Sequence, residues 1–504
     1  MHVKTLILSA IFTLSATIPG FTLDIYLNRQ PVRSWSRDSL ETLSYTIPAT
    51  NGFSSGLSLD EVLPLCVSAY RMRAVGKNES RTVERTFEDE QMAEKFHTWY
   101  LTASPSGQWD LFVAGSRVPA VHTIELYGEP LSEKQLEIWV SWEGVPLLKE
   151  EIRRFSDLHD LQIKVTEVPR IETKMISVLR AGGRPADVVM VQSDYLPALV
   201  RSRAIQRLDY LSFDSLIAKA RRSFTLDGGS WAVPFYFDSQ LLFYNPRLLA
   251  EEPALDWTLA DLERLAEGVR TRFPKTSPMT WNAYSAYWLA AFQIGFGKEE
   301  LVQADGSIRI DEPATHRALT YLLDLQRRGL LDVGEREAMI SLFTSERVAM
   351  ILTGSYSIPL LERLNVEFGV IPYPAVKRGG RSLAPFLDFK GWAVSRTTYS
   401  PVLARRLIRY LSGIGVQQRF PAELSKLPVN RECWQIMSRT NRYYPVLARS
   451  TEIGVPVPTE EAYGVYKNTM WKLLRFLFSG QMGVEELLKQ GQQIIDAQMS
   501  HNAR

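Results

Sequence analysis

Two neighbouring segments in the middle of the chain place the strongest constraint on its fold. The first runs from Gly182 to Asp209 and the second from Gly228 to Leu249. In each segment a short apolar run ends in polar and aromatic residues, and a helix-like pattern follows. The carboxyl edge of the sheet in an α/β protein presents side chains in this way, and ligands tend to bind there. The two segments therefore predict an α/β fold with a ligand site at strand ends.

The sequence from Leu136 onward supports this fold class. Apolar strand-like runs alternate with amphipathic helical patterns, which favours an α/β domain. The pattern predicts strands at 136–140, 161–168 and 186–191, and helices at 145–159, 171–180, 253–273, 316–328, 402–412 and 484–497. Thr258 and Asp261 form a capping signal inside the third of these helices, 253–273.

The first part of the chain, residues 23 to about 130, has a different texture. Strands are predicted at 23–27, 43–47, 67–74, 109–114 and 120–126, and short helices at 57–63 and 88–100. A chain of 504 residues is too long for one core. We therefore expect a small β-rich or α+β domain at 23–130 and a larger domain at 131–504. The segment 128–135, with Gly, Pro and charges but no apolar period, is predicted to link them.

The N-terminus has the features of an export signal. Lys4 precedes an apolar run from Leu6 to Ile18, and small residues follow around Gly20. This pattern predicts a signal peptide at residues 1–22, cleaved after Gly20 or Thr22. The run is shorter than the ~20 residues of a membrane-spanning helix, although an uncleaved anchor stays open. The segment contains no Cys for lipid attachment, so we expect a soluble periplasmic protein.

Composition and motifs exclude several classes of function. The formal net charge is 58 − 56 = +2, too small to indicate binding of nucleic acid. Cys66 and Cys433 match no metal-ligand spacing, and we expect two buried thiols, with a disulfide left open. The sequence has no HExxH, GxSxG, Walker or GxGxxG motif. We therefore expect no metal, no cofactor and no enzymatic activity.

A series of motifs occurs in a specific order between residues 135 and 498. They are LEIWVSWEG, ADVVMVQSDY, VPFYFDSQLLFYN, TWNAYSAYWLAAF, RVAMILTGSYSIPLL, APFLDFKGWAVS and FLFSGQMGVEELLKQGQQII. This order resembles family 1 of the extracellular solute-binding proteins, the maltose-binding-protein type that serves sugar ABC importers. The resemblance implies a two-lobed periplasmic-binding-protein fold of type II, with an additional N-terminal domain ahead of it. It places lobe 1 at about 135–236 and 391–435, lobe 2 at about 241–386 and 436–498, and the hinge at about 237–240 and 387–391.

The resemblance also implies a set of ligand-binding residues at strand ends and at the turns between lobes. They are Trp142, Glu143, Asp194, Tyr195, Tyr236, Asp238, Tyr287, Trp288, Tyr356, Asp388 and Tyr463. Aromatic rings suit the apolar face of a pyranose, and a carboxylate can accept hydrogen bonds from two adjacent hydroxyls. Helix capping stays open as the role of Asp194 and Asp238. Val191, Ser285 and Lys467 stand where maltose-type binders have other residue types, which argues against maltose itself.

The function that this resemblance implies is that of a periplasmic receptor for a carbohydrate. The expected carbohydrate is an oligosaccharide. Ligand would close the lobes about the hinge, and the permease subunits of an ABC importer would accept it. We expect a monomer. The alternatives left open are the same fold binding a polyamine, a glycerol phosphodiester or a peptide, an exported glycosidase, and a signalling or adhesion protein. The absence of Arg from the predicted site argues against a phosphate ligand.

Overall fold

The computed structural model describes residues 21–49, 52–104, 106–142, 144–209 and 215–502. The chain divides into two compact units, residues 1–132 and 133–504. Almost all of the predicted signal peptide falls outside the described residues, and Thr22 begins the first strand. In the described ranges, no helix combines the length and the apolar character needed to cross a membrane.

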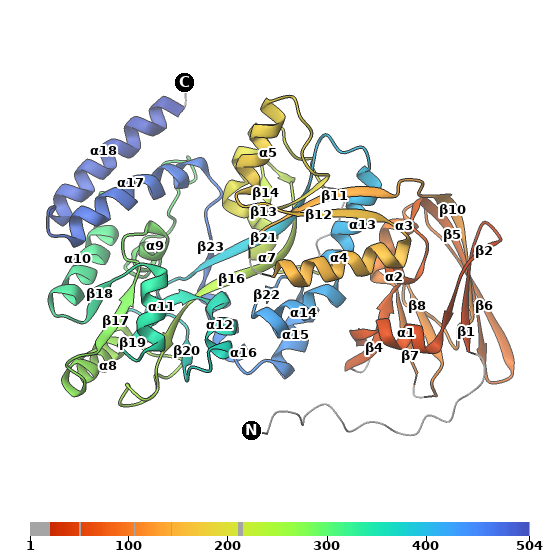
Figure 1. Cartoon of the computed structure of the whole chain (residues 1–504), viewed down its shortest axis with the longest axis horizontal. Coiled ribbons are helices and arrows are strands. Elements are labelled where there is room, and N and C mark those ends of the chain that lie inside the picture. Colours follow the sequence, from red (N-terminus) through yellow and green to blue (C-terminus); the bar gives the residue numbers. More distant parts are fainter. Residues whose placement is uncertain (1–20, 50–51, 105, 143, 210–214, 503–504) are drawn as a thin grey trace. The chain divides into compact units, whose positions relative to one another are not determined.

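The N-terminal unit consists mainly of strands (Figure 1). Its elements are β1 (Thr22–Leu27), β2 (Gln30–Ser36), α1 (Arg37–Leu43), β3 (Tyr45–Ala49), β4 (Gly52–Ser58), α2 (Leu59–Val62), β5 (Cys66–Asn78), β6 (Arg81–Glu88), α3 (Met92–Lys95), the 3-10 helix η1 (Phe96–Thr98), β7 (Tyr100–Ala103), β8 (Trp109–Val113), β9 (Ser116–Val118) and β10 (Thr123–Pro130). They form two five-stranded sheets, in the orders β2-β1-β10-β5-β6 and β3-β4-β7-β8-β9. Strands β1 and β10 pair in parallel, and the other pairs are antiparallel.

Two boundaries in this unit differ from the sequence prediction. The helix predicted at 88–100 is wrong at both ends, because Glu88 closes β6 and Tyr100 opens β7. Pairing with neighbouring strands outweighs the local helical pattern there. The predicted linker at 128–135 is also too long, because residues 128–130 belong to β10 and Gln135 begins β11.

The C-terminal unit alternates strands and helices. Its elements are β11 (Gln135–Val140), α4 (Val145–His159), β12 (Gln162–Glu167), α5 (Ile171–Arg180), β13 (Val188–Gln192), η2 (Ser193–Tyr195), α6 (Leu196–Arg201), α7 (Ala218–Ser223), β14 (Thr225–Leu226), β15 (Gly229–Ser230), β16 (Val233–Tyr244), α8 (Leu259–Arg272), β17 (Ser277–Trp281), α9 (Ala286–Gly295), α10 (Pro313–Arg327), β18 (Leu331–Val333), α11 (Arg336–Thr344), β19 (Val348–Gly354), η3 (Ser355–Ser357), α12 (Ile358–Arg363), β20 (Gly369–Ile371), β21 (Phe386–Val394), α13 (Pro401–Leu411), α14 (Ile414–Leu424), β22 (Leu427–Pro428), α15 (Arg431–Thr440), α16 (Tyr444–Ile453), β23 (Val455–Pro456), α17 (Glu461–Phe478) and α18 (Val484–Asn502). Helices α4 and α5 have the bounds that the sequence predicts, and the predicted capping box of Thr258 and Asp261 is present at α8.

Two long strands connect the two halves of the main sheet in this unit. The sheet runs in the order β12-β11-β13-β21-β16-β19-β17-β18. Strand β16 pairs with β21 along residues 233–239 and with β19 along residues 240–244. Figure 1 shows β16 and β21 side by side between the elements around β13 and those around β19. Both strands are buried almost throughout, so they form a common core for the two halves.

The strands on either side of this pair are parallel among themselves. Strands β11, β12 and β13 are parallel in one half, and β17, β18 and β19 are parallel in the other. Ligand sites in such sheets lie beyond the carboxyl ends of the strands. The residues that follow β11, β13 and β19 are therefore the first place to look for a functional site.

Candidate functional site

A 3-10 turn follows the last strand residue at two of these carboxyl ends. After β13 the turn η2 carries Asp194 and Tyr195, and after β19 the turn η3 carries Tyr356. Each turn passes into a short helix with a proline in its first turn, α6 and α12. Proline is favoured there because the first helical N–H groups need no intrahelical partner. The same local design thus places predicted site residues at both ends.

Asp194 is paired with a lysine from a distant helix. Lys467 on α17 donates from Nζ to Asp194 Oδ2 at 2.7 Å. The Asp194 side chain is 5% exposed, whereas that of Lys467 is 34% exposed. The Lys467 ammonium also lies 5.8 Å from the ring centre of Tyr195 and 5.0 Å from that of Tyr463. This pair therefore brings η2 and α17 together around two aromatic rings.

A second aspartate–lysine pair lies on strand β21. Lys390 Nζ donates to Asp388 Oδ2 at 2.5 Å, and because the two residues are two apart on a strand they share one face. Burial raises the pKa of Asp388, the charge of Asp194 raises it further, and Lys390 and Lys426 oppose the shift. Lys390 also lies 5.4 Å from the ring centre of Trp142. The Asp388 carboxylate is therefore within the electrostatic reach of Asp194.

Trp142 has an unusual backbone conformation. Its φ is 65°, in the left-handed region that bulky residues seldom adopt. The residue lies two positions after the last residue of β11 and is partly buried. Backbone conformations of this kind cost free energy and persist where the surroundings hold them, often at binding sites.

The third pair is deeply buried between the lobes. Lys426, just before β22, donates to Asp238 Oδ2 at 2.8 Å and to Oδ1 at 3.1 Å. Ser355 of η3 donates to Asp238 Oδ1 at 3.0 Å. The Lys426 and Asp238 side chains are 1% and 5% exposed. Asp238 lies inside β16, so it does not cap a helix, and its two carboxylate oxygens accept from Lys426 and Ser355.

Aromatic rings gather around the three pairs. Two cations lie near the ring centre of Tyr356, Lys426 at 5.6 Å and Arg336 at 4.7 Å. Burial raises the pKa of Tyr287 well above its ordinary range, and the neighbouring Asp388, Tyr356 and Tyr463 raise it further. Tyr463 is also buried, and its ring stacks on Tyr466 at 6.0 Å. These tyrosines thus share one environment with the aspartates.

Several buried oxygens in this cluster lack a hydrogen-bond partner among the described residues. They are Ser193 Oγ, Asp194 Oδ1, Asp388 Oδ1 and Tyr463 Oη. A buried polar group without a partner costs about 1–3 kcal/mol, and most such groups in proteins are satisfied. Their concentration between η2, β21 and α17 indicates a place where a polar ligand supplies the missing partners.

Glu172 is a further buried carboxylate beside this cluster. It lies in the first turn of α5 and accepts a hydrogen bond from the backbone N–H of Gln192 at 3.3 Å. Burial raises the pKa of Glu172 to about 6, and the charge of Asp194 adds to the shift while Lys390 opposes it. Glu172 is 3% exposed. Its hydrogen bond to Gln192 holds the end of β13, immediately before η2.

The structure brings together most of the residues predicted for the site. Trp142, Asp194, Tyr195, Tyr287, Tyr356, Asp388 and Tyr463 surround the lysine pairs described above. Tyr236 is 1% exposed and stacks on Phe420 at 5.7 Å, while Trp288 is 8% exposed and lies edge-on to Tyr287 at 5.2 Å. Glu143 lies outside the described residues.

The predicted ligand-binding residues did not include the lysines of this site, although the resemblance placed Lys467 where maltose-type binders have another residue type. Lys390 could have been found, because alternation along a strand places it on the same face as Asp388. Lys467 follows Tyr463 by four residues, one turn along the same helix face. Lys426 and Glu172 have no local signal, because their partners are distant in sequence.

Three further features of the described residues lie outside this site or add no metal ligands to it. A cavity of about 250 Å³ is lined by Glu362, Cys433 and Tyr443 among others and contains none of the predicted site residues. No group of three or more potential metal ligands occurs in the part of the chain that the structure describes. Cys66 and Cys433 are both buried.

Comparison with known proteins identifies the family. The sequence matches the family described as "Bacterial extracellular solute-binding protein" over residues 151–435, more than half of the chain. The chain belongs to this family. The predicted resemblance is therefore confirmed at the level of the solute-binding family.

Curated relatives of this solute-binding protein are distant. The maltodextrin-binding protein MdxE of Bacillus subtilis is 23% identical over 290 residues, which is 55% of this chain and 69% of the relative. The galactooligosaccharide-binding protein of the same organism is 25% identical over 298 residues, 55% of this chain and 68% of the relative.

Solved structures show the same fold. The maltotriose-binding protein of Thermus thermophilus, solved with maltotriose bound, superimposes with a TM-score of 0.63 at 21% identity. The superposition covers 72% of this chain and all of that structure. The predicted two-lobed α/β fold is confirmed by this likeness.

Proposed function

We propose that this chain is the exported receptor of an ABC importer and binds a carbohydrate, an oligosaccharide, between its two lobes. It holds its ligand without chemistry and delivers it to permease subunits in the membrane. Membership of the solute-binding family and the oligosaccharides named for the relatives MdxE and the galactooligosaccharide-binding protein support the proposal.

The observation that carries the proposal is the set of buried oxygens that have no hydrogen-bond partner among the described residues and lie beside aromatic rings. Asp194 Oδ1 and Asp388 Oδ1 are acceptors, and Tyr463 Oη can donate or accept. Sugar hydroxyls provide matching donors and acceptors, and hydrogen bonds to a carboxylate are about twice as strong as neutral ones. The rings of Trp142 and Tyr356 supply apolar faces for a pyranose. A polyhydroxy ligand meets both needs at once.

The charges of the cluster favour a neutral ligand. Each of the three aspartates already has a lysine within 2.5–2.8 Å. A polyamine would need carboxylates that are not yet neutralised, and it would meet the three ammonium groups. A phosphodiester would have to compete with the aspartates for the same lysines. Neutral hydroxyls instead use the lone pairs that the lysines leave unoccupied.

We assign the predicted residues to two roles. Ligand contacts are proposed for Trp142, Asp194, Tyr195, Tyr287, Tyr356, Asp388 and Tyr463, with Glu143 kept as a prediction. A framework role is proposed for Tyr236, Asp238 and Trp288, because Tyr236 stacks on Phe420, Asp238 is bound by Lys426 and Ser355, and Trp288 packs edge-on against Tyr287. Lys390 and Lys467 position Asp388 and Asp194 for the ligand.

Closure about a hinge follows from the way β16 and β21 pass between the lobes. We place the hinge at about 237–240 and 387–391, as in the sequence prediction. Gln240 supports this assignment, because its side chain donates to the backbone of Tyr287 at 2.9 Å and accepts from that of Phe386 at 3.0 Å. Ligand that contacts η2 and η3 together stabilises the closed form by its differential affinity.

The remaining features complete the proposal. The signal peptide predicted at residues 1–22 is cleaved after Gly20, which leaves β1 complete, and the mature protein is a periplasmic monomer. Lobe 1 comprises about 135–236 and 391–435, and lobe 2 about 241–386 and 436–498. The N-terminal unit precedes this receptor as a separate domain.

A thermal-shift screen tests the proposal. We would use protein that begins at residue 21, so that β1 is complete, and add neutral mono- and oligosaccharides, spermidine or glycerophosphocholine. A ligand at one hundred times its dissociation constant adds about 2.7 kcal/mol of stability. We expect shifts with oligosaccharides alone. A shift with spermidine and none with sugars would reassign the aspartates to a polyamine.

A further inference from the structure

A stripe of four residues continues the site along helix α17. Tyr463, Lys467, Trp471 and Arg475 follow one another at intervals of four residues and therefore lie along one face of the helix. The first two belong to the cluster described above. Trp471 is 50% exposed, whereas tryptophan side chains are on average highly buried.

Trp471 is supported by a stack that fixes its orientation. The guanidinium of Arg475 lies 4.6 Å from the ring centre of Trp471 and 4.9 Å from that of Tyr284. Glu335 accepts a hydrogen bond from Arg475 at 2.9 Å and another from Asn282 at 3.3 Å. A planar guanidinium held by a carboxylate between two rings is well ordered. The Trp471 ring is thus pre-oriented although half of it is exposed.

We infer that Trp471, Arg475 and Tyr284 form an outer subsite for the distal units of an oligosaccharide. The inference rests on the proposed function, because the inner units would lie at Asp194 and Tyr463. Eight residues of helix separate Tyr463 from Trp471, a rise of about 12 Å. That separation exceeds one sugar ring, so only a ligand of several units reaches both.

The continuity of the stripe favours the same ligand over a protein partner. Lys467 connects the inner and outer parts, since it contacts Asp194 and lies one helical turn from Trp471. The Trp471 ring has Arg475 beside it, and Glu335 accepts a hydrogen bond from Arg475. The ring thus offers an apolar face with polar groups next to it. This matches a pyranose, with its apolar face and its hydroxyl rim.

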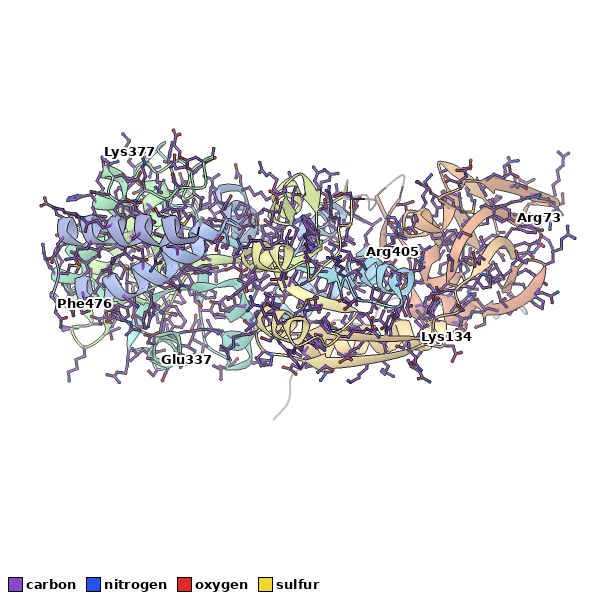
Figure 2. The ribbon with its side chains drawn as sticks, turned by 90° about the horizontal axis from the view of Figure 1, so that it is seen from above. Arg73, Lys134, Glu337, Lys377, Arg405 and Phe476 are labelled. Carbon is purple, nitrogen blue, oxygen red and sulfur yellow. The ribbon has the colours of Figure 1, made fainter. Side chains whose placement is uncertain are left out.

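Helix α17 also provides a matched control. Phe476 is 47% exposed, but it lies five residues beyond Trp471 and hence on a different face of the helix. Figure 2 shows Phe476 at the outer surface of the unit. Removing its ring changes a comparable exposed aromatic without touching the stripe.

The experiment is calorimetric titration of four proteins with sugars of increasing length. The proteins are the wild type, Trp471→Ala, Trp471→Phe and Phe476→Ala, and the sugars are the maltose to maltopentaose series and galactooligosaccharides of two to five units. We expect wild-type affinity to rise with length. Trp471→Ala should lower affinity for the longest sugars about fivefold or more and leave disaccharide affinity unchanged.

The control variants and the other outcomes decide the inference. Trp471→Phe should keep most of the gain with length, and Phe476→Ala should keep all of it. An unchanged gain in Trp471→Ala, or an equal loss for every length, would overturn the outer subsite. A wild type that binds sugars without a length effect would do the same while leaving the proposed function intact. A wild type that binds no sugar would remove both.

Discussion

The turns after β13 and after β19 share a backbone design but present different chemistry. Each is a serine-led 3-10 turn at the end of a buried strand, and each leads into a short helix that contains proline in its first turn. The first turn presents the carboxylate of Asp194, with one oxygen left without a partner among the described residues. The second presents the ring of Tyr356.

The serines at the start of the two turns also differ in their hydrogen bonding. Ser193 Oγ is buried without a partner in the described part of the chain, whereas Ser355 Oγ donates to Asp238. The first turn thus keeps polar atoms available for a ligand, and the second uses its polar atom to hold the framework. In the proposed receptor, the first turn would bind sugar hydroxyls and the second would contact an apolar sugar face.

The largest expected effect is on stability and concerns the Lys426–Asp238 pair, to which Ser355 of the second turn is bonded. The Lys467–Asp194 pair of the first turn is the comparison. Lys426→Met leaves Asp238 buried without its cation, which should lower the free energy of unfolding by about 3–5 kcal/mol. Lys467→Met should cost less, because Lys467 is one-third exposed and water can take the place of its ammonium group beside Asp194. Urea unfolding of both variants measures the difference.

A paired variant checks the cause of this loss. Lys426→Met combined with Asp238→Leu removes both charges and should recover most of the lost stability. Equal and small losses in the two single variants would show that the second turn does not depend on its buried ion pair.

Asp194→Asn tests the acceptor of the first turn. Hydrogen bonds to a charged group contribute about 1.5–3 kcal/mol, so sugar affinity should fall at least tenfold while the fold is retained. Asp157→Asn is the matched control, since Asp157 is 70% exposed on α4 and pairs with Arg153. Calorimetry with the sugars found in the screen gives the ratio. Wild-type affinity in Asp194→Asn would exclude this turn from the site.

Glu172 gives the first turn a dependence on pH. Its folded pKa of about 6 lies above the ordinary 4.5, so the folded state binds this proton more tightly than the unfolded state does. The stabilisation by this proton is fully present below pH 4.5 and is lost as the pH rises through 6. The total loss is at most about 2 kcal/mol. Glu172→Gln should remove that loss. Urea unfolding at pH 4.5, 6 and 7.5 compares the two proteins, and parallel pH profiles would contradict the prediction.

Local patterns determined how well each region could be predicted from the sequence. Helices α4 and α5 were predicted at their observed bounds, because their apolar positions recur with the helical period. The segment 88–100 was wrong because pairing with β5 and β4 decides its ends. The local sequence pattern of a segment does not reveal which distant strands it pairs with.

The same limit applies to the site. The family resemblance implied Asp194, Tyr356 and Asp388 as site residues, because a short motif of the sequence carries each of them. The ion pairs depend on partners that lie 273 residues apart for Lys467 with Asp194 and 188 apart for Lys426 with Asp238. The division into contacts and framework therefore needed the fold.

Tyr356→Ala tests the ring of the second turn and should have the smallest effect of the four. Loss of one stacked ring should weaken sugar binding about tenfold, and Tyr356→Phe should restore most of it because the ring remains. Gly354→Ala offers an independent route to the same result. A Cβ at Gly354 would lie 2.1 Å from Tyr356 Cε1, so the ring would have to move although its chemistry is unchanged. If Tyr356→Ala and Gly354→Ala both bind sugar like the wild type, the second turn presents no ring to the ligand, and the contrast between the two turns is structural alone.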